Sequence, residues 1–519
     1  MAQPIEISFH GAAGTVTGSC FVIKGNGKTI LVDCGMFQGS RALEALNHEP
    51  LPFDVKQIDA VLLTHAHLDH SGRLPYLVAS GCKATIWTTP PTAGILEPLL
   101  LDSAKIQAGD ATRRNRRPDR KGTKPFIPLY SASDVSKTTN KVAHAPFCQW
   151  NDLGGGDGFR FWDARHIVGS ASVELKLGGN RILFSGDIGS GSLAQCPGVE
   201  VGGSDYVICE STYGNRTREP FLITDRREQL AHYVEETLAR NGNVLIPSFA
   251  VERTQVILED LLALFAAKRL KPVNVFVDSP LAELVTRATQ RYRNGGFDLM
   301  SVPNIRFTHT VDESKRLEKM SGAIIIAGSG MCQGGRIRNH LLNNLPLSQS
   351  RVLLVGYQVA GTLGALLRDG AKHVRISGHD VPVRADIAMI ETYSTHADRP
   401  ELLKWITQHG PISSSVFLVH GEGPALTTLA KDLSDNAVAP YVITPTLGET
   451  WNLTPGQGPN KTVEARTDVQ MQTNPPDWTA DFAVFESSIA KRLRALPSDA
   501  ARQSAVASLS RAMKQAEGF

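Results

Sequence analysis

The pattern of apolar residues changes twice along this chain, and these changes limit the folds that it can adopt. Up to about residue 210, short apolar runs recur between glycine-rich breaks, as in Ile5 to Phe9 and Ser172 to Leu177. Many alternate with polar residues, which predicts strands packed as sheets with few outer helices. From about Pro220, helical and strand patterns follow in turn and predict a mostly parallel sheet with covering helices. After Asp386 the pattern returns to helix, strand and helix.

The length of the chain also indicates more than one domain. Its 519 residues exceed what a single hydrophobic core usually holds. We predict four segments, residues 1–215, 216–385, 386–460 and 461–519, in which a second domain interrupts the first and a helical tail follows. In the tail, Ser498 is placed to begin a helix.

Composition and charge are those of an ordinary globular protein. Hydrophobic residues make up 42% of the chain, charged residues 20%, and the formal net charge is +3. Nucleic-acid-binding domains are usually strongly basic, so any surface that attracts a polyanion must be local. The N-terminal residues lack a charged stretch followed by an apolar run, and no later segment approaches the roughly 20 apolar residues that span a bilayer. We therefore expect a cytoplasmic protein that does not insert into membranes.

The seven cysteines are odd in number, widely scattered and never spaced as C-x-x-C. This distribution argues against a disulfide framework and against zinc held by thiolates. We expect most of these cysteines to be small buried side chains.

The clearest chemistry lies in the segment Thr64–Gly72, which contains His65, His67, Asp69 and His70. The segment follows a predicted strand and precedes a predicted helix. Two histidines two positions apart in extended chain point to the same side and can share a cation, whereas the residues at the turn can reach a second cation. A lone histidine is more often an ordinary buried polar residue, but four ligand-type side chains within six positions favour a metal site.

Two metal sites need further ligands, and these must come from distant parts of the chain. His166, Asp187 and His420 each follow a predicted strand. Any one of them is equally well explained as a loop cap. Taken together, they supply the ligand types that the Thr64–Gly72 segment lacks.

The same segments, in the same order, resemble the successive motifs of the metallo-β-lactamase superfamily, to which Asp33 in Leu31–Gly35 also belongs. Segments around Glu210, His396 and His420 are similar to the additional motifs of the β-CASP subgroup, which consists largely of nucleases. The resemblance implies an α/β fold, in which an αββα metallo-β-lactamase sandwich carries an inserted α/β β-CASP cap. The sandwich would comprise residues 1–215 and 386–460, and the cap residues 216–385.

The resemblance further implies two zinc ions per chain, with one aspartate shared between them. Asp33 would orient ligand imidazoles, as metal-bound histidines generally require. The implied ligands are His65, His67, His166 and Asp187 for one ion, and Asp69, His70, Asp187 and His420 for the other.

A pair of cations about 3.5 to 4 Å apart suits hydrolysis of a phosphodiester by water. By the same resemblance, His396 is the general acid for the leaving oxygen, and Glu210 keeps this histidine protonated. Asp33 and Asp69 are counted with them as catalytic residues. Attack of water on phosphorus with departure of the 3′ oxygen would leave a 5′-phosphate and a 3′-hydroxyl.

The cap resembles its family counterparts in segments such as Ser248–Gln255, which implies a cleft for single-stranded RNA. The glycine-rich segment Gly328–Arg336 follows a predicted strand, and free backbone amides there can cradle a phosphate. A tight loop without a ligand is the alternative. The residues expected to bind substrate are Ser329, Gly330, Arg336 and Arg253.

RNA is expected rather than DNA because the DNA nucleases of the family generally lack a histidine at the last motif, where this chain has His420. The basic run Arg113–Lys121 either draws RNA toward the site or is a solvated loop. One rival is a hydrolase of small acyl or thioester substrates, which the cap, Glu210 and His396 disfavour. Another is a scaffolding subunit, which the complete ligand set disfavours. Endonuclease and exonuclease action, and a monomer or a homodimer, are equally compatible with the sequence.

Overall fold

The computed structural model describes residues 3–116, 125–190, 202–219, 222–292, 298–356, 358, 361–466, 489, 492–493 and 496–516. The chain divides into two compact units, and the second interrupts the first. The limits of the four predicted segments remain a prediction. Unit 1 comprises Met1–Pro220, Leu281–Met300 and Ser394–Gln472, and unit 2 comprises Phe221–Pro280, Ser301–Tyr393 and Thr473–Phe519.

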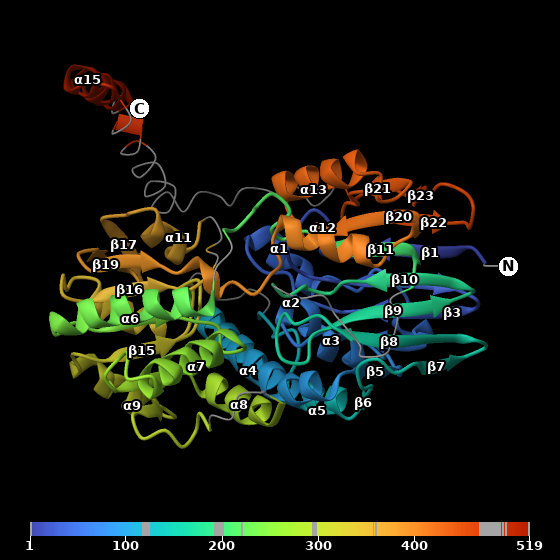
Figure 1. Ribbon diagram of the computed structural model, residues 1–519, viewed down its shortest axis with the longest axis horizontal. Helices are drawn as coiled ribbons and strands as arrows, with labels where there is room; N and C mark the ends of the chain where they lie inside the picture. The colour runs from blue at the N-terminus through green and yellow to red at the C-terminus, as the bar shows by residue number, and fades with distance from the viewer. Residues whose placement is uncertain are drawn as a thin grey trace. The chain divides into compact units, whose positions relative to one another are not determined.

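Unit 1 is built on two sheets, which in the described part of the chain have eight and seven strands (Figure 1). The first sheet has the order β23 (Asn460–Val463), β22 (Thr450–Leu453), β1 (Ile5–Phe9), β2 (Phe21–Gly25), β3 (Lys28–Val32), β4 (Ala60–Leu62), β5 (Thr85–Thr88) and β6 (Val142–His144). The second has the order β21 (Tyr441–Ile443), β20 (Ile412–Val419), β11 (Ser204–Glu210), β10 (Asn180–Phe184), β9 (Ala171–Leu177), β8 (Asp157–Asp163) and β7 (Asn151–Gly154). Strands β3 to β6, and likewise β10, β11, β20 and β21, run parallel, so their carboxyl ends meet at one edge of each sheet.

Alternating strand residues divide between two kinds of core in unit 1. Ile23 and Phe161 are among the buried residues between the two sheets. Residues adjacent to this core in the sequence point outward: Val22, next to Ile23, packs with the helices outside the first sheet, and Leu183, between the core residues Ile182 and Phe184, with those outside the second. This layering confirms the expected αββα sandwich. The covering helices are α3 (Leu74–Ala79), α4 (Pro90–Asn115) and α5 (Ala132–Thr139) on one side, and α12 (Arg399–Gln408) and α13 (Gly423–Asp435) on the other.

Unit 2 contains a sheet in which every described neighbouring pair of strands is parallel, as the alternating pattern predicted. Its order is β14 (Ile305–Phe307), β13 (Val275–Asp278), β15 (Ile324–Ala327), β12 (Val244–Pro247), β16 (Arg351–Leu354) and β19 (Asp386–Met389). A small antiparallel ribbon consists of β17 (His373–Ile376) and β18 (His379–Pro382). The helices of this unit include α6 (Ile223–Ala239), α7 (Arg253–Ala266), α9 (Val311–Arg316), α10 (Ile337–Asn344) and α11 (Leu363–Arg368).

Several local features differ from expectation or extend it. Helix α4 extends to Asn115 and includes the start of the basic run, whereas Arg117–Lys121 lie outside the described residues. Five cysteines are free and buried, as expected for most of the seven. Cys148 is disulfide-bonded, which the cysteine spacing did not predict. Ser498 accepts a hydrogen bond from the Ala501 amide at 3.2 Å and begins α15 (Asp499–Ala516), as predicted.

No described helix combines the length and the apolar character that a membrane crossing requires.

Candidate metal centre

The Thr64–Gly72 segment begins just beyond β4 and enters the short helix α2 (Leu68–Ser71). Because β4 ends here between parallel neighbours, the histidines after it lie at the shared carboxyl edge of the first sheet. His65 is fully buried and His70 is 2% exposed. Backbone hydrogen bonds fix the segment, since the Ser19 amide donates to Asp69 O and the Cys34 amide to His70 O, each at 2.8 Å.

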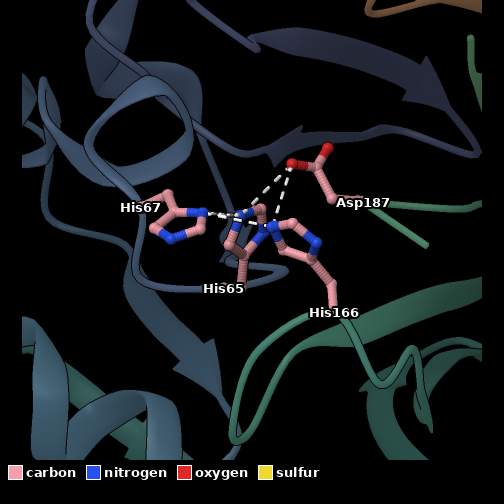
Figure 2. Close-up of side chains that lie close together, drawn as sticks. All are labelled: His65, His67, His166 and Asp187. Carbon is pink, nitrogen blue, oxygen red and sulfur yellow. Dashed lines mark hydrogen bonds and ion pairs between the residues drawn. The ribbon is translucent and has the colours of Figure 1, made fainter. Parts of the chain in front are cut away.

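Four side chains from three separate stretches meet in one cluster, shown in Figure 2. Nδ1 of His67 lies 3.1 Å from Nε2 of His65 and 3.3 Å from Nε2 of His166. Oδ2 of Asp187 lies 3.6 Å from Nε2 of His65 and 3.5 Å from Nε2 of His166. The four donor atoms lie within 4.8 Å of one another, so one cation can contact them all.

Burial keeps the histidines of this cluster in the form that binds metal. It lowers the pKa of His67 to about 4 and holds the pKa values of His65 and His166 well below the ordinary value. At neutral pH all three imidazoles are therefore neutral and offer a lone pair to a cation.

A second cluster lies next to the first. It consists of Asp69, His70 and His420, whose donor atoms also lie within 4.8 Å of one another. Oδ1 of Asp187 lies 3.2 Å from Nε2 of His70 and 3.7 Å from Nε2 of His420. One carboxylate oxygen of Asp187 thus faces each cluster.

Two buried polar atoms in this region have no hydrogen bond. They are Oδ1 of Asp187 and Nε2 of His420, on residues only 2% and 4% exposed. A buried polar atom without a partner costs free energy, whereas a cation between these atoms would satisfy both. The donor set therefore fits a divalent metal.

Asp33 holds one ligand of the second cluster, His70, and also Thr64. It accepts hydrogen bonds from the Thr64 amide and from Thr64 Oγ1, both at 2.8 Å, and from Nδ1 of His70 at 2.7 Å. Its position requires an unusual backbone conformation with a φ of 59°. Because Nδ1 of His70 is engaged here, Nε2 is the ring nitrogen that faces the second cluster.

His396 lies beside the metal clusters and against Glu210. Nδ1 of His396 is 3.2 Å from Oε2 of Glu210, and its ring centre is 4.5 Å from that of His166. Burial alone would lower the pKa of His396, but the Glu210 carboxylate, with Asp187 and Asp69, raises it above the ordinary value. The structure thus favours a protonated imidazole at this point.

Sequence reasoning missed three threonines that approach the outer nitrogens of the histidines. Thr64 Oγ1 lies 3.1 Å from Nδ1 of His65, Thr395 Oγ1 lies 3.2 Å from Nδ1 of His166, and Thr212 Oγ1 lies 3.0 Å from Nδ1 of His420. Each threonine stands inside a motif already recognised. The pairing itself has no local signal, since Thr395 and His166 are 229 positions apart.

The residues expected to bind substrate all belong to unit 2, whereas the two clusters belong to unit 1. Two of them are engaged within the unit: Arg336 donates to Oδ1 of Asp278 at 2.7 Å, and Arg253 Nη1 donates to Val355 O. Ser329 Oγ accepts from the Gly334 amide at 3.1 Å, and the Ser329 amide donates to Gly334 O. Several groups of the glycine-rich segment, which also contains Gly330, are thus used inside the loop. Binding of substrate here remains a prediction.

Three family models match this chain. Residues 13–193 match the metallo-β-lactamase superfamily, and residues 254–367 match the β-CASP domain. Residues 380–443 match the Zn-dependent metallo-hydrolase RNA specificity domain. The matches follow one another along the chain in the order that the motifs suggested.

The chain is also similar to curated proteins. It is 35% identical over 437 residues to Ribonuclease TTHA0252 of Thermus thermophilus, which covers 82% of this chain and 95% of that protein. It is 28% identical over 458 residues to Transcription termination factor FttA of Methanosarcina mazei, with 83% and 69% covered. It is 28% identical over 449 residues to Endoribonuclease YSH1 of Kluyveromyces lactis, covering 82% of this chain but only 56% of that protein.

One solved structure, of a protein of unknown function from Enterococcus faecalis V583, shares the fold. The two align with a TM-score of 0.51 and 14% identity, covering 87% of this chain and 100% of the other. At that identity the similarity concerns the fold alone.

Proposed function

The chain belongs to the β-CASP family of metallo-β-lactamase-fold hydrolases, and on that premise we propose that it is a zinc-dependent ribonuclease that hydrolyses single-stranded RNA. The observation that carries the proposal is the position of Asp187, with one carboxylate oxygen toward each of two ligand clusters. A side chain shared in this way suits a pair of cations, and paired cations suit phosphodiester hydrolysis.

We infer two zinc ions per chain. Ligands about 2.0 to 2.2 Å from a tetrahedral zinc lie about 3.3 to 3.6 Å from one another. The neighbouring donor atoms in the first cluster are 3.1 to 3.6 Å apart. The donors are imidazoles and carboxylates, a set that suits zinc and other transition metals better than calcium or magnesium.

The metals, when bound, would lower the pKa of a water molecule and neutralise charge on the phosphoryl oxygens. The chain's own residues hold this chemistry in place. Asp69 and Asp187 bring negative charge to the second cluster. Burial alone would raise the pKa of both carboxyls, but the neighbouring histidines hold both pKa values below the ordinary value. Both therefore stay ionised at neutral pH. Asp33 keeps the His70 ring oriented through its hydrogen bond to Nδ1.

His396 supplies the proton that the leaving oxygen needs. The Glu210 carboxylate raises the pKa of His396 and so favours the protonated imidazole, the form that can donate. Departure of the 3′ oxygen would leave a 5′-phosphate on one product and a 3′-hydroxyl on the other.

RNA is the proposed substrate because two of the relatives carry the names ribonuclease and endoribonuclease. The match to an RNA specificity domain model points the same way. We place the activity in the cytoplasm, and we assign substrate contacts to unit 2 through Ser329, Gly330, Arg336 and Arg253.

The test uses a single-stranded RNA labelled at either end, a DNA of the same sequence and a thioester. We expect the full chain, with about two zinc ions bound, to cleave the RNA into products with 5′-phosphates. A chelator should abolish cleavage, and added zinc should restore it. Consumption of the thioester while the RNA stays intact would reverse the assignment in favour of a small-molecule hydrolase.

A further inference from the structure

The Arg218 side chain is hydrogen-bonded to the backbone of the segment that contains His396. Its Nη1 donates to Ser394 O at 3.2 Å, and its Nη2 donates to His396 O. One guanidinium thus holds the peptide oxygens on both sides of Thr395. The side chain is only 14% exposed, and its backbone amide donates to Asp398 Oδ2 at 2.8 Å.

The opposite side of the same segment is held by backbone hydrogen bonds. The Ser190 amide donates to Thr395 O at 2.9 Å, and the Ala397 amide donates to Ile188 O at 2.7 Å. Because these bonds come from the loop that follows Asp187, the segment is fixed between a metal-ligand loop and Arg218.

Two functional contacts depend on this short segment. Thr395 Oγ1 lies 3.2 Å from Nδ1 of His166, and Nδ1 of His396 lies 3.2 Å from Oε2 of Glu210. A shift of the Ser394–His396 backbone would therefore displace both contacts together.

We propose that Arg218 is a positioning residue that sets the location of the His396 imidazole relative to the metal clusters. The inference rests on the proposed function, in which His396 is the general acid. Arginine suits the task because its planar fork can donate to two neighbouring carbonyls at once, whereas a lysine offers one point of attachment. Glu401 orients the fork, since its Oε2 lies 3.3 Å from Arg218 Nη2 and its Oε1 accepts from Ser190 Oγ at 3.0 Å.

A direct contact between Arg218 and RNA is the competing role. The guanidinium already donates to two carbonyl oxygens and one carboxylate, and it lies 5.6 Å from the centre of the Tyr213 ring. These partners account for its terminal nitrogens without a phosphate, which favours positioning.

The test compares Arg218→Ala and Arg218→Lys with a matched control, Arg399→Ala. Arg399 stands three residues beyond His396, but its side chain is 37% exposed and pairs at 3.5 Å with Asp432. Four quantities are measured for each full-length protein: kcat and KM on single-stranded RNA, zinc content, and backbone hydrogen exchange over residues 394–398.

We expect Arg218→Ala to lower kcat by about 10²-fold, as for a displaced catalytic group, with KM and zinc content close to wild type. Hydrogen exchange over residues 394–398 should accelerate in Arg218→Ala, and methylguanidinium in the buffer should restore part of its kcat. The kcat of Arg218→Lys should fall between those of Arg218→Ala and wild type. Arg399→Ala should match wild type.

Hydrogen exchange unchanged in Arg218→Ala would overturn the inference whatever happens to activity. A rise in KM alone would instead make Arg218 an RNA contact. A wild-type protein without activity on RNA would contradict the proposed function. Hydrogen exchange over residues 394–398 tests independently whether Arg218 fixes this backbone segment.

Discussion

Nδ1 of His396 lies 3.2 Å from Oε2 of Glu210, and Glu210 is only 1% exposed. Glu210 is held there by donors of its own, the Ile188 amide and Thr212 Oγ1, both at 2.5 Å. A carboxylate fixed in this way favours the charged form of its neighbour. The pair therefore has the geometry of a proton donor and the group that keeps it charged.

The separation of roles between His396 and the ligands gives the first prediction. His396→Ala should lower kcat by about 10²- to 10⁴-fold, the usual contribution of a general acid, while zinc content stays near wild type. His67→Ala should lose metal and activity together, because it removes a donor from the first cluster. Metal analysis beside RNA cleavage checks both. Equal metal loss in the two variants would remove His396 from the acid role.

The pH dependence of cleavage should report on Glu210. The Glu210 carboxylate raises the pKa of His396, so Glu210→Gln should lower that pKa and deprotonate the acid at a lower pH. The falling alkaline limb of the kcat profile should therefore move to lower pH. In a His396→Ala background, Glu210→Gln should leave the pH dependence of kcat unchanged. A shift of the alkaline limb in that background would show that another group titrates there.

Asp33 should affect metal affinity more than catalysis by the loaded enzyme. Asp33→Asn removes the charge that accepts hydrogen bonds from Thr64 and His70. Loss of such an outer partner typically costs 10- to 100-fold in metal affinity, which competition with a zinc chelator measures. Asp54→Asn, an exposed aspartate on the same unit, serves as the control and should leave affinity unchanged.

Arg336 offers a stability prediction that separates two roles. Its partner Asp278 is fully buried and also accepts from Ser314 Oγ and from Nε2 of His340, each at 2.6 Å. Removal of one donor from this carboxylate in Arg336→Ala should lower the free energy of unfolding by about 1 to 3 kcal/mol. Arg306→Ala, which removes an exposed arginine, should change it little. Unchanged stability with a raised KM for RNA would favour the substrate-binding role.

Much of the fold was predictable because the relevant signals are local. The strands around Ile5–Phe9 and Ala171–Leu177, and the α/β pattern after Pro220, follow from the spacing of apolar residues, and the structure confirms them. Helix α5 was not predicted, although Ser131 and Asp134 form a capping box at its start. The disulfide of Cys148 was not predicted either, because cysteine spacing alone does not show which thiols lie close together in the fold.

The sequence by itself determined the donor types, since the motifs place histidines and aspartates directly after strands. Only the tertiary structure decided which donors share a cluster, that Asp187 divides its two oxygens between them, and that Arg218 holds the segment beside His396. The physical reason is distance along the chain. Apolar periodicity sets the direction of a side chain within its own element, whereas the convergence of residues hundreds of positions apart depends on how the two sheets pack.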